Sequence, residues 1–208
     1  IHVKFLHMNT ITGHTGLTAL LGSPVAHSIS PLMHNEAFRL LGLDYVYLCF
    51  DVNEETLPAA VAGLKTCGIR GFNLTMPNKN KIVELLDELS PEAQLIGAVN
   101  TVLNDNGKLI GYNTDGYGFM QSVRDAGHDI SGKNITVMGV GGASMAICAQ
   151  SALDGAASVH IFARRTSRYW NRTQKFAENL SAKTGCQVCL FDNDDHKALK
   201  DSIAQSYL

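Results

Sequence analysis

No stretch of this sequence approaches the ~20 uninterrupted apolar residues that a membrane-spanning helix needs, so we expect no transmembrane segment. An excess of one charge is also lacking, because 17 Lys and Arg residues stand against 19 Asp and Glu residues, for a formal net charge of −2. A chain this close to neutral has no overall field to attract nucleic acid or a membrane surface. The sequence therefore predicts a small-molecule partner.

A disulfide framework is missing as well. The five cysteines, at positions 49, 67, 148, 186 and 189, lie mostly inside apolar runs, which is typical of reduced core thiols and of a cytoplasmic protein. Cys186-x-x-Cys189 has the spacing of a metal or redox pair, but no second pair completes a zinc site. Because the segment CQVCLF alternates as a strand does, we predict a strand there and no metal site.

The opening IHVKFLHMNT has too short an apolar stretch for a signal peptide and no small-residue cleavage site, so we expect no secretion signal and take Met8 as the natural start. Internal repeats and low-complexity segments are absent too. What is present is a chain of 208 residues with 45% apolar content, enough to bury a real core in one large or two small domains.

Short apolar runs alternate with segments of helical period along the chain, which is the pattern of parallel βα units and predicts an α/β fold. The expected strands are 17–22, 45–52, 71–76, 135–140, 157–162 and 186–191. The expected helices are 30–41, one capped by Asn53 and ending at Gly68, 79–86, one capped by Ser90, 115–127, 143–153, 171–183 and 195–204.

The segment AVNTVLNDNGKLIGYN (98–113) breaks the parallel pattern, because its Asn-Asp-Asn-Gly turn joins two apolar runs and predicts a hairpin. We expect this hairpin to form an antiparallel edge of the sheet. The polar, turn-rich segment GHDISGKN (127–134) is the best candidate for a linker.

A glycine turn follows the expected strand 135–140. Gly139-x-Gly141-Gly142 stands where a β-branched strand gives way to an Ala-rich helix, and such a turn lets backbone N–H groups and the helix dipole approach a pyrophosphate. The usual third glycine is replaced by Ser144. The order of strand, turn, helix and strand favours dinucleotide binding over a merely structural turn.

The end of the next strand reads HIFARRTSR and carries no acid for the ribose hydroxyls of NAD. Arg164 and Arg165 can instead grip a 2′-phosphate through charge-assisted hydrogen bonds, which favours NADP. The alternative is a basic turn in solvent.

Three polar clusters lie in the N-terminal half: SPVAHSISP (23–31), NLTMPNK (73–79) and GYNTDG (111–116). The first two follow expected strands, where ligands of parallel sheets bind. Pro77 fixes its own φ and restricts the residue before it, which would give Lys79 a stiff mounting at the edge of a site. By spacing alone, a lysine in solvent remains the simpler interpretation, and Asp115 could be no more than a helix cap.

Together, SPVAHSISPLMHNEAF, NLTMPNK, GAVNTV, GYNTDGYGF and GVGGAS resemble, in order and spacing, the shikimate dehydrogenase family, including its quinate/shikimate branch. The resemblance runs from about Leu17 to the end of the chain. It implies reversible reduction of 3-dehydroshikimate to shikimate with a nicotinamide cofactor, on the route to chorismate and the aromatic amino acids. It also implies a substrate-binding catalytic domain at 1–114 and a Rossmann-like NADP-binding domain at 115–208.

The resemblance also implies roles for individual residues. Lys79 and Asp115 match the catalytic pair, in which an ammonium stabilises the charge that grows on the carbonyl oxygen and a carboxylate orients it. The matches to substrate contacts are Ser28 and Ser30 for the carboxylate and Thr75 and Asn100 for the ring oxygens. The matches to the pyrophosphate turn are Gly139, Gly141, Gly142 and Ala143.

Two departures from the family pattern bear on specificity. The NAD-using branch carries an acid where this chain has Thr166, and it often has Ser where this chain has Thr75, so we expect an NADP-linked enzyme that prefers shikimate. An NAD-linked quinate/shikimate dehydrogenase and a non-catalytic quinate- or shikimate-sensing relative remain as alternatives. Family members continue well beyond the position of Leu208, so we expect an incomplete dinucleotide-binding domain here. We expect a monomer or a homodimer.

Overall fold

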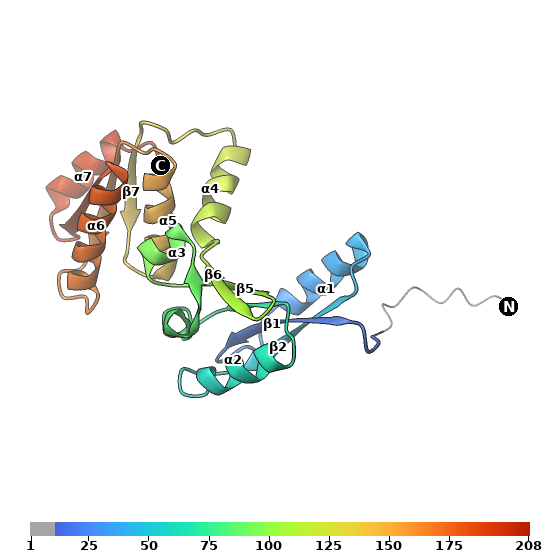
Figure 1. The fold of residues 1–208 in the computed structure, drawn as a ribbon. Helices are drawn as coiled ribbons and strands as arrows, with labels where there is room; N and C mark the ends of the chain where they lie inside the picture. Colours follow the sequence, from blue (N-terminus) through green and yellow to red (C-terminus); the bar gives the residue numbers. More distant parts are fainter. Residues whose placement is uncertain (1–10) are drawn as a thin grey trace. The chain divides into compact units, whose positions relative to one another are not determined.

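The computed structural model describes residues 11–208, so the opening segment with Met8 lies outside the described residues. Two compact units make up the chain (Figure 1). The first runs to Leu89 and takes up the chain again over Val99–Tyr112, and the second combines Ser90–Ala98 with Asn113–Leu208. The division therefore differs from a single boundary after residue 114, because residues 90–98 group with the second unit.

The first unit is built on a six-stranded mixed sheet with the order β2-β1-β3-β5-β6-β4. Its strands are β1 (Gly16–Gly22), β2 (Tyr45–Asp51), β3 (Gly71–Leu74), β4 (Glu88–Leu89), β5 (Thr101–Asp105) and β6 (Lys108–Tyr112). β1 is parallel to both β2 and β3, as the alternation of strands and helices predicts. β5 is antiparallel to both of its neighbours.

The predicted hairpin is confirmed as β5 and β6, with Asn106 and Gly107 at positive φ (52° and 92°) in its turn. Asn104 Oδ1 accepts a hydrogen bond of 2.7 Å from the backbone N–H of Gly107 and so fixes the turn. The expectation of an edge hairpin is wrong, because the two-residue strand β4 pairs in parallel with β6 beyond it.

Two helices and a 3₁₀ turn complete the first unit: α1 (Ser30–Leu41), α2 (Leu57–Thr66) and η1 (Lys81–Leu85). Gly42 ends α1 in the left-handed conformation (φ 66°), as the sequence predicts. The predicted cap at Asn53 is wrong, since α2 begins at Leu57 and its N-cap is Thr56; Asn53 Oδ1 accepts from the backbone N–H of Thr56, in the turn that precedes the helix. The expected α-helix at 79–86 is wrong, since only the short η1 forms there.

The second unit has a three-stranded parallel sheet in the order β7-β8-β9, formed by β7 (Asn134–Met138), β8 (Ser158–Ala163) and β9 (Gln187–Asp192). Its helices are α3 (Pro91–Ile96), α4 (Asp115–Asp125), α5 (Gly142–Leu153), α6 (Trp170–Thr184) and α7 (His196–Gln205). Each predicted βα unit of this half is confirmed.

Helices cover both faces of this sheet, which makes it doubly wound (Figure 1). Ile135, Val159 and Ile161 point into one buried core together with residues of α5 and α6. On the opposite face, Ser202 of α7 contacts Thr136 Oγ1 at 2.8 Å and His160 Nδ1 at 2.9 Å. The alternation of side chains along the strands thus explains why helices pack on both sides.

The segment 127–134 is not a linker. Ile130 is buried in the core of the second unit, and the backbone N–H of Gly132 donates to Gly155 O at 2.8 Å. Ser90 caps α3 as predicted, accepting from Ala93 N, and Ile96 lies in this same core. Within residues 11–208, no helix is both long enough and apolar enough to cross a bilayer.

Candidate active site

The glycine turn lies between β7 and α5. Gly139 has a φ of 103°, which only glycine adopts readily, and its N–H donates to Phe162 O at 2.8 Å, fixing the turn to the end of β8. Gly141 stands before the first residue of α5, and a Cβ at Gly141 or Gly142 would meet nothing within 4 Å. The first N–H groups of α5 lack partners inside the helix and can bind an anion.

A cavity of about 560 Å³ opens beside this turn. Gly139 and Gly141 line it from the end of β7, and Arg164 lines it from the end of β8. Among residues 11–208, neither Arg164 nor Thr166 has a side-chain hydrogen bond or ion pair. The cavity therefore offers cationic and hydroxyl groups that the fold itself does not use. Its full lining is Gly139, Val140, Gly141, Ala163, Arg164, Thr166, Ser167, Arg168, Tyr169 and Asn193.

Not every residue that the sequence assigned to the cofactor lines this cavity. Gly142 and Ala143 open α5 but are not part of the lining, and Arg165 places its guanidinium 5.5 Å from the centre of the Trp170 ring. Thr166, Ser167, Arg168, Tyr169 and Asn193 were not assigned to the cofactor from the sequence. For Thr166, Ser167 and Arg168, the sequence did offer a signal, namely a run of polar residues after a predicted parallel strand. For Asn193 it offered none.

In the first unit, the end of β3 lies against the end of β1 and the start of β5. The N–H of Thr75 donates to Leu21 O at 3.0 Å, and a side chain at Gly22 would collide with Thr75 Cγ2. The N–H of Ser23 donates to Met76 O at 2.9 Å, so this contact continues past the end of β1. The polar segments 23–31 and 73–79 thus leave the sheet at the same edge, as parallel strands require.

Lys79 and Asn100 lie at this same edge. Lys79 O accepts from Val99 N at 2.8 Å, and Asn100 O accepts from Leu74 N at 2.8 Å. Asn100 is 9% exposed, and its Oδ1 accepts from Thr101 Oγ1 at 3.0 Å. The fold therefore brings Asn100, which lies much further along the sequence, beside Thr75 and Lys79 through the pairing of β3 with β5.

The peptide bonds Ser23–Pro24 and Met76–Pro77 at this edge are both cis. Ser28 and Ser30 follow the first of them, and both are half-buried. The Ser30 N–H donates to Ser28 Oγ at 3.2 Å, immediately before α1. Two hydroxyl groups beside the first turn of a helix are suited to a carboxylate.

Asp115 belongs to the second unit, where it is the first residue of α4. Its N–H donates to Asn113 Oδ1 at 3.2 Å, and Asn113 is held in turn by a bond of 3.0 Å from its Nδ2 to Ala98 O. Thr114, the N-cap residue, makes no side-chain capping bond. Asn113 thus helps to fix the start of α4 by accepting from the backbone N–H of Asp115.

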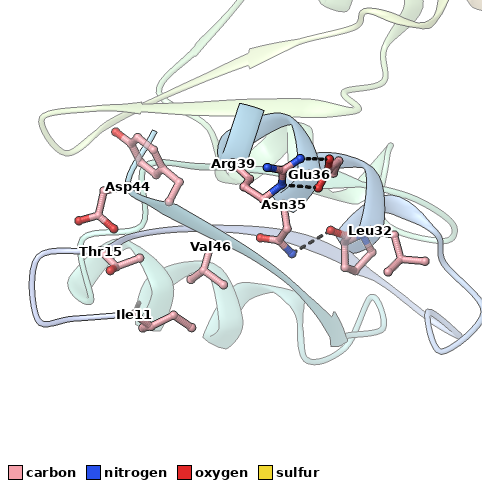
Figure 2. Close-up of a pocket in the computed structure, with 10 residues that line it drawn as sticks. Ile11, Thr15, Leu32, Asn35, Glu36, Arg39, Asp44 and Val46 are labelled. Atoms are coloured by element: carbon pink, nitrogen blue, oxygen red, sulfur yellow. Dashed lines mark hydrogen bonds and ion pairs between the residues drawn. The ribbon is translucent and has the colours of Figure 1, made fainter. Parts of the chain in front are cut away.

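A second cavity, of about 430 Å³, lies in the first unit between α1 and the outer edge of β2 (Figure 2). Figure 2 shows Arg39 paired with Glu36 and the Asn35 amide bonded to the backbone. Asn35 also exchanges two hydrogen bonds with the Tyr47 backbone, at 2.8 and 3.0 Å. The polar side chains of α1 at this cavity already have partners within the fold.

Across residues 11–208, no three His, Cys, Asp or Glu side chains group closely enough to hold a metal ion. All five cysteines are free thiols, and Cys189 lies in β9 as predicted. A doubly wound parallel sheet with a glycine turn at the end of its first strand defines a Rossmann-like fold of the dinucleotide-binding class.

Comparisons with known proteins identify the family. Residues 20–102 match the family described as shikimate dehydrogenase substrate binding domain. The chain is 51% identical to "Shikimate dehydrogenase (NADP(+))" from Listeria innocua over 95% of this chain and 68% of the relative, and 48% identical to the protein of that name from Streptococcus pyogenes over the same shares.

The solved structure of shikimate 5-dehydrogenase from Listeria monocytogenes, in complex with shikimate and NAD, superimposes with a TM-score of 0.91 at 50% identity, covering 94% of this chain and 68% of that one. This chain belongs to the shikimate dehydrogenase family. Both the predicted family and the predicted fold class are thereby confirmed.

Proposed function

We propose that this protein is an NADP-dependent shikimate dehydrogenase, an oxidoreductase that interconverts 3-dehydroshikimate and shikimate. The observation that carries the proposal is the 51% identity, over 95% of the chain, to a relative named as the NADP(+) enzyme. The cavity of the second unit supports the cofactor, since its glycine turn and its arginines suit a phosphorylated dinucleotide.

In this proposal, residues 1–114 bind the substrate and residues 115–208 bind NADP. Ser28 and Ser30 hold the substrate carboxylate, and Thr75 and Asn100 contact the ring oxygens. The shared edge of β1, β3 and β5 supports this set of residues, because backbone hydrogen bonds fix it to one end of one sheet. Side chains that project from a backbone fixed in this way can hold a substrate in one orientation.

Lys79 acts as the acid/base and Asp115 as its orienting partner. During reduction, negative charge grows on the carbonyl oxygen of 3-dehydroshikimate, and the ammonium of Lys79 stabilises that charge and delivers the proton. In the reverse direction Lys79 receives the proton from the hydroxyl of shikimate. The role proposed for Asp115 is to direct the amino group of Lys79 at the reacting oxygen. NADPH, when bound, supplies the hydride.

The residues proposed to hold NADP fit the group. Gly139, Gly141, Gly142 and Ala143 would hold the pyrophosphate, because Gly141 and Gly142 leave open space at the N-terminus of α5. Arg164 grips the 2′-phosphate. Arg165, over the Trp170 ring, adds positive charge to the same turn without lining the cavity.

NAD use is the second candidate, because the Listeria monocytogenes structure contains NAD. An NAD site normally carries an acid at the end of the second strand, whereas this chain has Arg164, Arg165 and Thr166 there. We further propose a cytoplasmic monomer or homodimer that binds no nucleic acid. Its five free thiols support the cytoplasmic location, and its net charge of −2 supports the absence of nucleic-acid binding.

The test is formation of reduced nicotinamide from shikimate or quinate with NADP or NAD, compared as four values of kcat/KM. Shikimate with NADP should give the largest value. Lys79→Ala should lower kcat by about 10² to 10⁴ with a much smaller change in KM, because it removes a group that acts in the transition state.

Lys81→Ala is the matched control, since Lys81 pairs with Glu84 on the surface of η1 and should keep normal kcat. Binding of shikimate without turnover would instead identify a sensing relative. A Lys79→Ala enzyme with near-normal kcat would remove the proposed mechanism.

A further inference from the structure

Asn193, the first residue after β9, lines the cavity of the second unit. Its side-chain oxygen Oδ1 is shielded from solvent and has no hydrogen-bond partner among residues 11–208. A shielded amide oxygen without a partner normally costs stability, so it calls for an explanation.

In the described part of the chain, Asn78 Oδ1 is the one other buried side-chain oxygen without a hydrogen-bond partner. Asn78 is fully buried, and its Nδ2 donates to Val52 O at 2.7 Å, so the fold uses this amide and holds it in place. Within residues 11–208 no such bond holds the Asn193 amide, although the backbone N–H of Asn193 donates to Ala163 O at 2.9 Å. The Asn193 backbone is therefore fixed, whereas no hydrogen bond from the described residues holds its amide in one orientation.

The order of the strands tells which part of a dinucleotide would meet Asn193. The glycine turn follows β7, Arg164 follows β8 and Asn193 follows β9, and these strands are neighbours in that order. With the pyrophosphate at the turn and the 2′-phosphate at Arg164, the base that is attached to the same ribose extends toward the end of β9. This step rests on the proposed NADP function.

We propose that Asn193 reads the adenine base of NADP, with Nδ2 donating to N7 and Oδ1 accepting from the N6 amino group. An asparagine amide matches this edge of adenine with two hydrogen bonds. A hypoxanthine base presents an oxygen in place of the amino group, so Oδ1 loses its donor. Asn193 thus selects an adenine dinucleotide over an otherwise identical hypoxanthine dinucleotide.

The test is calorimetric binding of NADP and of its hypoxanthine analogue to the full 208-residue chain, which needs no turnover. The native protein should bind NADP at least about tenfold more tightly than it binds the hypoxanthine analogue. Asn193→Leu, of similar volume but without polar atoms, should bind the two equally. Asp194→Ala is the matched control in the same loop, because Asp194 does not line the cavity, and it should keep the native preference.

A preference for NADP that persists in Asn193→Leu would overturn the adenine role while leaving the proposed function intact. Equal binding of both dinucleotides by the native protein would do the same. Failure of the native protein to bind either dinucleotide would overturn the adenine role and the NADP function together. The melting temperature of ligand-free Asn193→Leu should be unchanged or higher, since the variant removes an unpartnered oxygen; a marked fall would show that the amide serves the fold.

Discussion

The two cavities differ in what their polar groups do. In the first unit, Glu36 and Arg39 bind each other and Asn35 binds the backbone of two elements. In the second unit, Ser167, Arg168 and Tyr169 bind one another, but Arg164 and Thr166 have no side-chain partner within residues 11–208, and neither does the amide oxygen of Asn193. A cavity whose polar groups bind one another serves the fold, whereas one whose polar groups lack partners is suited to a ligand.

The backbone at the two cavities differs in the same way. Next to α1, the Asn35 amide occupies the N–H and C=O of Tyr47 on the outer edge of β2, as a neighbouring strand would. At the start of α5, Gly141 and Gly142 border open space, with no atom within 4 Å of where a Cβ would be. Because they carry no side chain, the backbone N–H groups there stay accessible to a ligand. Substitutions on each side should therefore separate effects on stability from effects on binding.

Among substitutions at the two cavities, the largest effect is expected at Arg164. Replacing it with Ala should weaken NADP binding by about 10- to 100-fold, because a charge-assisted hydrogen bond to the 2′-phosphate is lost. NAD affinity should stay nearly unchanged, since NAD lacks that phosphate. Calorimetric titration with both cofactors measures the difference, and Arg165→Ala is the control, with a smaller loss. Equal loss for NAD and NADP would count against this assignment.

Asn35→Leu should leave NADP affinity unchanged but lower the free energy of unfolding by about 2 kcal/mol. The substitution leaves the backbone N–H and C=O of Tyr47 without the Asn35 amide as their partner, and Tyr47 is only 2% exposed. Urea denaturation monitored by circular dichroism measures this, with Leu32→Ala, at a side chain 77% exposed, as the near-neutral control. A stable Asn35→Leu protein would show that the amide is not needed at the β2 edge.

The smallest effect is expected for Arg39→Met. Arg39 and Glu36 are one turn apart on the surface of α1, and exposed pairs of this kind contribute little, so the melting temperature at neutral pH should hardly change. The hydrogen bond from Arg39 lowers the pKa of Glu36. The small contribution of this ion pair to stability is therefore fully present when the pH is above the ordinary pKa of glutamate. It is lost as the pH falls through the lowered pKa of Glu36 in the folded protein. A melting-temperature difference between variant and native protein that grows in acid would contradict this.

Local signals made most of the fold predictable. Gly42, Gly68 and Gly127 each stand near a helix end with positive φ (66°, 73° and 85°), and a helix stop of this kind depends only on its nearest neighbours. The glycine turn at 139–142 and the arginines after β8 were recognisable for the same reason. The family motifs added the residues of the first unit, whose proximity comes from the pairing of β3 with β1 and β5.

The errors arise where long-range contacts decide. Segment 127–134 has a linker's composition, but Ile130 is buried in the second core, which composition does not reveal. Strand β4 has two residues, too few for any periodicity, and so the outer position beside β6 was missed. Asn193 follows β9 in an ordinary polar loop, and only the cavity around it distinguishes its side chain.

Helix α3 has a practical consequence for anyone who recombines enzymes of this family. It lies near the end of residues 20–102, the segment that matches the substrate binding domain of the family, yet Ile96 is buried in the core that α5 and α6 share. A chimera joined at residue 114 would inherit α3 from one parent and the surface that receives it from the other. Exchange of cofactor preference between homologues should therefore transplant residues 90–98 along with everything from residue 113 onward.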